Sequence, residues 1–134
     1  MKVVVVGCGL LGSRLAANLG AAGHEVAVVD RRPEAFAALG DSFGGETAVG
    51  TGIDVDVLRR AGVEEADAVV AVTDCDNTNL MAAQVARQIF KVRRVVARVM
   101  DPERAEIYRP GGFDIICPTT RTVDIFQHAV LGGE

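Results

Sequence analysis

The sequence predicts a single-domain α/β fold in which a six-stranded parallel sheet is doubly wound, with helices on both faces. Six short apolar runs alternate with six helical segments from one end of the chain to the other. Such alternation is typical of a parallel sheet joined by right-handed crossovers. The length also suits one domain, because 134 residues with 49% apolar and 24% charged side chains match an ordinary globular unit. We therefore treat residues 1–134 as one domain.

The first half of the chain is expected to hold three strands and three helices. The first strand consists of consecutive valines, as is typical of a strand buried on both faces. The helices show boundary signals: Gly23 follows the first, Pro33 opens the second, and Asp54 can cap the third. In order, the elements are strand 3–6, helix 10–22, strand 25–30, helix 33–39, strand 47–49 and a helix from 54 to 60 or 61.

The second half repeats this alternation. The longest helix is expected at 77–90, where apolar residues from Leu80 to Ile89 recur at helical spacing. Pro102 suits the first turn of the following helix, and a Pro-Gly-Gly sequence lies beyond its end. In order, the elements are strand 67–72, helix 77–90, strand 94–99, helix 101–108, strand 113–117 and helix 119–130.

Composition excludes several classes of protein. A net charge of −4 argues against non-specific binding to nucleic acid or anionic lipid, and 4% aromatic residues argue against a stacking platform for single strands. Cys8, Cys75 and Cys117 are too widely spaced for a zinc motif, and their odd number suits a reducing compartment. No stretch approaches the roughly 20 apolar residues of a membrane helix, so direct membrane insertion is not expected.

A glycine motif lies between the first expected strand and the first expected helix. It reads Gly7, Cys8, Gly9, Leu10, Leu11, Gly12. In this context Gly7 permits the tight turn, Gly9 lets a pyrophosphate approach the backbone, and Gly12 lets helix and strand pack closely. The helix N-terminus would then present N–H groups to phosphate. The motif predicts a Rossmann-like nucleotide-binding unit; the alternative is that the glycines serve only a tight turn.

Asp30 ends the second expected strand, eighteen residues after Gly12. A carboxylate at this place typically accepts hydrogen bonds from the adenosine ribose and disfavours a 2′-phosphate. Arg31 and Arg32 follow it, and we expect them to lie on the adenine or to face water. The alternative for Asp30 is a purely structural role in capping the loop.

Three further segments are expected at the same edge of the sheet, because ligands of such folds lie over the carboxyl ends of the strands. Thr51 and Gly52 would flank the adenine, whereas Thr73 and Asp74 would border the rest of the nucleotide. Arg98 is the only cation within the strongly apolar segments. It would contact the ligand or, alternatively, form a salt bridge to Asp101 or at a subunit contact.

An enzymatic function is not expected. A dehydrogenase needs a substrate domain and an acid or base beside the nicotinamide, and the predicted elements leave no residues for that domain. Neither histidine lies near the glycine motif in chain order. Two alternatives stay open: a minimal NAD-dependent oxidoreductase or fragment of one, and a structural assembly module with a vestigial pocket.

Four segments in order carry a resemblance to a known family. They are VVGCGLLG at 5–12, GHEVAVVD at 23–30, AGV at 61–63 with ADAVVAVT at 66–73, and Asn79 with VARV at 96–99 and DP at 101–102. Together they resemble the N-terminal lobe of the RCK or KTN domain, the regulator of potassium conductance, which is called TrkA-N in Trk-type potassium uptake systems. The resemblance covers essentially all of residues 1–130.

The resemblance implies a regulatory, non-catalytic protein that binds NAD(H), ATP, ADP or a related adenine nucleotide. It also implies a homodimer or larger ring beneath a membrane-embedded potassium channel or transporter, on the cytoplasmic side. The C-terminal lobe of the full domain is expected to be absent from residues 1–134. The closing helix carries Ile125, Phe126, Ala129 and Val130, which we expect to pack either against a neighbouring subunit or on its own sheet.

Two departures from the family pattern bear on the ligand. The family commonly has Gly-Asp-Ala-Thr after the third strand, where this chain has a threonine, Thr51, in place of the carboxylate. Members that respond to ATP can carry an arginine within the glycine motif, where this chain has Leu10 and Leu11. The first departure removes a carboxylate from the expected contacts near the adenine. The second favours NAD(H), ADP or AMP over ATP, and we expect NAD(H) first.

Overall fold

The computed structural model describes residues 1–132 and contains a six-stranded sheet of order β3-β2-β1-β4-β5-β6. All five neighbouring pairs of strands are parallel. The strands are β1 (Lys2–Val6), β2 (Glu25–Asp30), β3 (Glu46–Val49), β4 (Ala68–Ala71), β5 (Arg94–Arg98) and β6 (Asp114–Ile116). The six strands that the sequence predicts are confirmed, in the predicted order.

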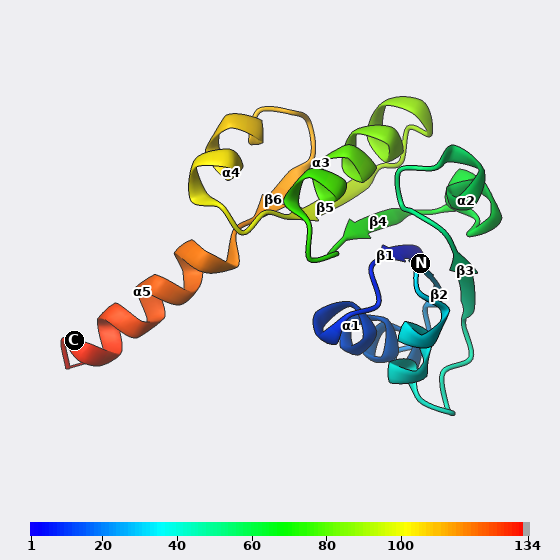
Figure 1. Ribbon diagram of the computed structural model, residues 1–134, viewed down its shortest axis with the longest axis horizontal. Helices are drawn as coiled ribbons and strands as arrows, with labels where there is room; N and C mark the ends of the chain where they lie inside the picture. Colours follow the sequence, from blue (N-terminus) through cyan, green and yellow to red (C-terminus); the bar gives the residue numbers. More distant parts are fainter. Residues whose placement is uncertain (133–134) are drawn as a thin grey trace.

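Helices cover both faces of this sheet (Figure 1). The α-helices are α1 (Leu10–Ala21), α2 (Val55–Arg60), α3 (Asp76–Gln84), α4 (Pro102–Tyr108) and α5 (Pro118–Val130). Two 3-10 helices, η1 (Pro33–Leu39) and η2 (Val63–Glu65), and a π-helical turn, η3 (Val85–Ile89), complete the described elements. One face is packed against α1 and η1, and the other against α2, α3 and α4 (Figure 1).

The central strand β1 is buried on both faces, as its run of valines predicts. Val4 and Val6 belong to the core beneath α2 and α3, whereas Val3 and Val5 belong to the core beneath α1. This division follows from the alternation of side chains along a strand. Because β1 lies in the middle of the sheet, the turn that follows it is held on both sides by well-packed neighbours.

Two predicted helices differ in detail, and a third is confirmed. Residues 33–39 form a 3-10 helix, and the expected helix at 77–90 changes after Gln84 into the π-helical turn. In that turn the N–H of Phe90 donates to the carbonyl of Val85. The Arg87 side chain donates to the carbonyls of Val92 and Arg93 and so ties the turn to the segment that leads into β5. The helix expected from 54 to 60 or 61 is confirmed as α2, which Asp54 caps; Gly62 follows it with a left-handed φ of 84° and precedes the short helix η2.

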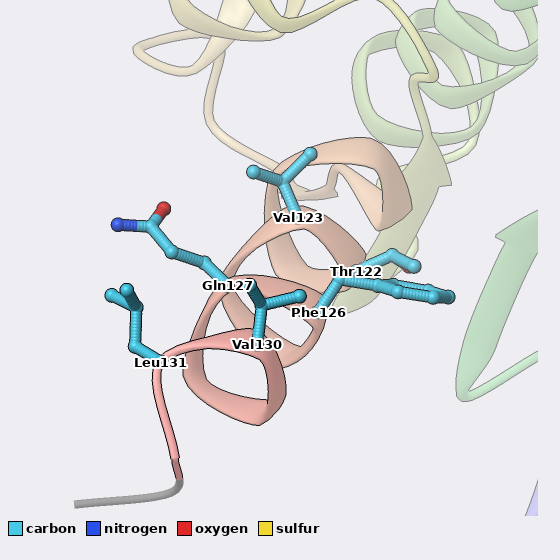
Figure 2. A pocket seen from close by; sticks show the side chains of 6 residues that line it. All are labelled: Thr122, Val123, Phe126, Gln127, Val130 and Leu131. Atoms are coloured by element: carbon cyan, nitrogen blue, oxygen red, sulfur yellow. The ribbon is translucent and has the colours of Figure 1, made fainter.

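The closing helix α5 extends away from the sheet (Figure 1). None of its residues is buried, and Val123, Phe126 and Val130 are 55%, 66% and 81% exposed. The expectation that this helix packs on its own sheet is therefore wrong for the described chain. Its apolar side chains stand free of other elements, as Figure 2 shows. Among residues 1–132, no helix has both the length and the apolar character that a membrane span requires.

Candidate functional site

A cleft of about 440 Å³ opens at the carboxyl ends of the central strands. Most of the residues singled out from the sequence line it. From the glycine motif these are Gly7, Gly9, Leu10 and Leu11, followed by Asp30 and Arg31. From the later segments they are Thr51, Gly52, Thr73, Asp74 and Arg98. Cys8 and Gly12 lie behind this surface, so the fold brings eleven of the thirteen residues to one cleft.

The glycines of the motif have three different structural roles. Gly7 has a φ of 108°, and a Cβ there would approach the backbone nitrogen of Thr73 to 2.8 Å. A Cβ on Gly12 would overlap the carbonyl of Gly7, so a side chain at position 12 would push α1 away from the turn. By contrast, a Cβ on Gly9 would meet no atom within 4 Å. The open space above Gly9 belongs to the cleft, so a ligand can approach the backbone there.

The N-terminus of α1 adds backbone donors beside this space. The first helical hydrogen bond runs from the N–H of Ser13 to the carbonyl of Gly9, 2.9 Å away, so the N–H groups of residues 10–12 precede it. Gly9 offers no side chain to cap them, and the first turn of α1 contains no acidic residue. An anion is therefore favoured at this helix end by both hydrogen bonding and the helix dipole.

Asp30 connects the end of β2 to the glycine turn. It is 8% exposed, and its Oδ2 accepts a hydrogen bond from the N–H of Cys8 at 2.8 Å. Its Oδ1 accepts the backbone N–H of Arg32 at 2.8 Å and the Nε of the same residue at 3.3 Å. A carboxylate has about four acceptor positions. One position on Oδ2 is thus left for a donor in the cleft, such as a ribose hydroxyl.

Arg32 makes a contact that the sequence did not predict. Its guanidinium pairs with Asp30, and its side chain is 54% exposed and lines the cleft. Burial alone would raise the pKa of Asp30, but the hydrogen bonds from the backbone N–H groups of Arg32 and Cys8, and then the Arg32 side chain, outweigh it and lower this pKa. Asp30 therefore caps its own loop, as the structural alternative predicts, and it also lines the cleft, where ribose binding stays a prediction.

Cys8 contributes its backbone, not its side chain. The thiol is buried and points toward the carbonyl of Ala35, 3.4 Å away. Burial, and then the negative charge of Asp30, raises the pKa of this thiol, which keeps it protonated and unreactive. Its N–H, already bonded to Asp30, is the group by which Cys8 shapes the site.

Asn79 organises the opposite wall of the cleft. This fully buried side chain accepts hydrogen bonds from the N–H of Thr73 at 2.8 Å and from its hydroxyl at 2.6 Å. Its amide nitrogen donates to the carbonyls of Thr73 and Arg98, at 3.0 and 2.9 Å. Asn79 therefore joins the ends of β4 and β5. Among the sequence signals, only the family resemblance pointed to this asparagine.

Arg98 is half-buried at the end of β5. Its Nη2 donates to the carbonyls of Val72 and Thr73, at 3.0 and 2.8 Å. The expected alternative of a salt bridge to Asp101 is wrong, because the Asp101 carboxylate caps α4 by accepting the N–H of Glu103 at 3.1 Å. The guanidinium of Arg98 instead reaches across the ends of β4 and β5 at the cleft.

The loop after β3 closes the other end of the cleft. Gly52 is buried, and a Cβ there would overlap the side chain of Val6, so the backbone of this loop rests directly on the end of β1. Sequence reasoning omitted several lining residues, namely Val6, Val29, Ile53, Val72 and Thr78. Hydrogen bonds from the side chain and backbone of Thr78 lower the pKa of the exposed Cys75 thiol. Cys75 directly precedes α3, at its N-cap position.

Solved structures share this fold. The TrkA-N domain of the inner membrane protein YbaL from Escherichia coli superposes with a TM-score of 0.84 at 16% identity, over 96% of this chain and 95% of that one. The channel protein GsuK bound to ADP superposes with a TM-score of 0.81 at 21% identity, over 99% of this chain and 34% of that one. The AMP-bound Kef C-terminal domain of Shewanella denitrificans superposes with a TM-score of 0.78 at 22% identity, over 98% of this chain and 82% of that one. GsuK has also been solved with NAD.

Sequence comparison identifies the family. The chain is 49% identical over 131 residues to the Trk system potassium uptake protein TrkA of Streptomyces coelicolor. That alignment covers 98% of this chain but only 59% of the relative's length. The model of the TrkA-N domain matches residues 3–118, which include all the strands except the first residue of β1, and the whole of the cleft described above. This chain therefore belongs to the TrkA-N domain family.

Proposed function

We propose that residues 1–134 form the nucleotide-binding lobe of a cytoplasmic regulator of potassium uptake, and that this lobe responds to NAD(H) or an adenine nucleotide. One observation carries the proposal: the buried carboxylate of Asp30 keeps one acceptor position at the cleft, beside the open space above Gly9. A ribose hydroxyl and a phosphate are the groups that these two features suit. The ADP, AMP and NAD carried by proteins of the same fold support the same ligand class.

The residues of the cleft favour some nucleotides over others. Asp30 would repel a 2′-phosphate, which favours NAD(H) over NADP(H). Leu10 and Leu11 are exposed beside the α1 N-terminus and offer no positive charge to a third phosphate. We therefore propose NAD(H) as the principal ligand, with ADP or AMP next and ATP bound more weakly.

The helix α5 supports an assembly of several copies. Val123, Phe126 and Val130 form an exposed apolar stripe along this helix, which has no partner among the described residues. A stripe of this kind typically marks an interface. The sheet also leaves Val96 half-buried and Ile116 41% exposed near its β6 edge. We propose that α5 packs against a second copy, in a dimer or larger ring that contacts a membrane-embedded potassium transporter.

Thermal unfolding with a panel of nucleotides tests the ligand. NAD⁺, NADH, NADP⁺, ATP, ADP and AMP are each added to the purified chain. A ligand at 100 times its Kd stabilises the fold by about 2.7 kcal/mol, which raises Tm by about 10 °C for a chain of this size. We expect a shift with NAD⁺ or NADH and none with NADP⁺. If no nucleotide raises Tm, the proposed function is wrong.

Uptake by cells tests the link to potassium. Cells that lack this protein are complemented with the wild-type chain in its natural context or with the Asp30→Ala variant, and the initial rate of rubidium uptake is measured. We expect the variant to lose regulation, with the uptake rate differing from that of wild type. Asp41→Ala, which removes an exposed carboxylate in the loop after η1, is the matched control. Equal uptake with and without the protein would contradict the proposal.

A further inference from the structure

Arg98 is the one basic residue of the cleft with a buried nitrogen that lacks a partner. Its Nε is shielded from solvent and has no hydrogen-bond acceptor among the described residues. Only Nη2 is engaged, by the carbonyls of Val72 and Thr73. A buried donor without an acceptor is unfavourable, so this side chain is arranged to gain a hydrogen bond that the chain itself does not supply.

The charge of Arg98 is also unpaired within residues 1–132. Its guanidinium forms no ion pair with a described carboxylate. The nearby Asp76 carboxylate is already bonded to the N–H groups of Met100 and Asp101 and lies 3.5 Å from Arg104. Half-buried charges are normally compensated by a charge of opposite sign. An anion in the cleft would supply it.

The strand order fixes which part of a nucleotide Arg98 can meet. Asp30, the ribose acid of the proposed function, ends β2, and the glycine turn beside Gly9 follows β1. Next in the sheet come β4 and β5, where the Arg98 guanidinium lies at the carbonyls of Val72 and Thr73. A ligand with its ribose at β2 and its first phosphate at the turn after β1 therefore continues toward Arg98.

We propose that Arg98 binds the second phosphate of the ligand and so selects diphosphates, either a nucleoside diphosphate or a dinucleotide, over a nucleoside monophosphate. The inference rests on the proposed function and adds which ligand group is recognised. The guanidinium turns from the two carbonyls toward the phosphate, where its planar fork donates hydrogen bonds to oxygen atoms of matching geometry. The Nε then gains the acceptor that it lacks.

Binding of AMP, ADP and NAD⁺ to Arg98→Gln tests this assignment by isothermal titration calorimetry. Loss of charge-assisted hydrogen bonds should weaken ADP and NAD⁺ by about tenfold or more, because such bonds contribute strongly to binding. AMP should change by less than about threefold, which also shows that the cleft is intact. The matched control is Arg94→Gln, which removes the same charge from the exposed first residue of β5.

The outcomes separate this inference from the proposed function. If wild type binds none of the three nucleotides, both are wrong. If wild type binds them and Arg98→Gln weakens AMP as much as ADP, or if Arg94→Gln reproduces the effect, only the role of Arg98 is overturned. Should Arg98→Gln not fold, Arg98→Lys replaces it: it keeps the charge but loses the fork, and a selective loss for ADP over AMP is again expected. An unchanged ratio of the two affinities in that variant would overturn the assignment.

Discussion

The carboxylate of Asp30 accepts a hydrogen bond from the backbone N–H of Cys8, 2.8 Å away, and so joins the end of β2 to the turn after β1. Cys8 lies between Gly7, which needs its positive φ, and Gly9, which faces open space. The same carboxylate that is proposed to bind ribose therefore also fixes the turn that is proposed to bind phosphate. Stability and ligand affinity are coupled at this one side chain.

Asp30→Asn should weaken both properties. The new NH₂ group cannot accept a hydrogen bond, so either the N–H of Cys8 or that of Arg32 loses its acceptor. We expect the free energy of unfolding to fall by about 1–3 kcal/mol, and nucleotide affinity to fall as well. Urea denaturation and calorimetry measure the two effects. Asp41→Asn, at an exposed loop position, should change neither, and equal losses in that control would contradict the argument.

The stability of the chain should fall in acid through Asp30. Hydrogen bonds lower the pKa of this carboxyl in the folded state. Its contribution is therefore fully present above the pKa of an unfolded aspartate, about 3.9, and is lost as pH falls through the lower folded value. We expect the difference in unfolding free energy between wild type and Asp30→Asn to be constant above about pH 5 and to shrink below about pH 4. Urea denaturation from pH 6 to pH 2.5 measures it; a difference independent of pH would refute this assignment.

Replacement by alanine should affect different properties at Gly9 and at Gly12. Gly9→Ala places a methyl group in open space at an extended backbone position, so stability should change by less than about 0.5 kcal/mol while nucleotide affinity falls. Gly12→Ala places a methyl group against the carbonyl of Gly7, and the free energy of unfolding should fall by about 1–3 kcal/mol. Thermal melts with and without ligand distinguish the two. A stable Gly12→Ala would show that α1 can shift without cost.

Asn79→Ala should loosen the wall between β4 and β5. The substitution removes the acceptor for the N–H of Thr73 and the donor to the carbonyl of Arg98 in a fully buried place. We expect a loss of about 1–3 kcal/mol in unfolding free energy, measured by urea denaturation. Asn18→Ala, at an exposed position of α1, is the matched control and should be neutral or slightly stabilising. A neutral Asn79→Ala would mean that water replaces the amide.

The strands and the glycine turn could be predicted because their requirements are local. A run of valines at 3–6 is typical of a strand buried on two faces. Gly7 supplies the positive φ of the turn, Gly9 leaves its backbone open, and Gly12 lets α1 approach the turn closely. The position of Asp30 at the end of β2 follows from the same alternation of strand and helix. The strands, the glycine turn and the position of Asp30 could therefore be predicted from the sequence alone.

Other features depend on partners that a sequence pattern does not name. The acceptors of Arg98 are the main-chain carbonyls of residues 72 and 73, which any residue type would supply. The pairing of Arg32 with Asp30 depends on the turn between them. Apolar spacing correctly predicts a helix at α5, but it does not say which surface that helix meets. The contacts of Arg98, Arg32 and the α5 side chains are therefore known only from the structure.

The exposed stripe of α5 should mediate self-association. Val123, Phe126 and Val130 recur at helical spacing and project from the helix free of other elements (Figure 2). Phe126→Asp puts a charge in the middle of this stripe, and a buried unpaired charge opposes association strongly. We expect wild type to sediment as a dimer or larger species and the variant as a monomer with unchanged thermal stability per chain, because Phe126 is 66% exposed in the single chain.

The matched control for this prediction is His128→Asp. His128 is exposed and lies five residues beyond Val123, which places it on the other side of the helix from the stripe. The added charge is the same, but it stays in water in either assembly, so the control should sediment as wild type does. Sedimentation velocity over a hundredfold range of protein concentration compares the three proteins. If wild type stays monomeric throughout that range, or if the control dissociates as fully as Phe126→Asp, then the apolar stripe is not the contact that holds copies together.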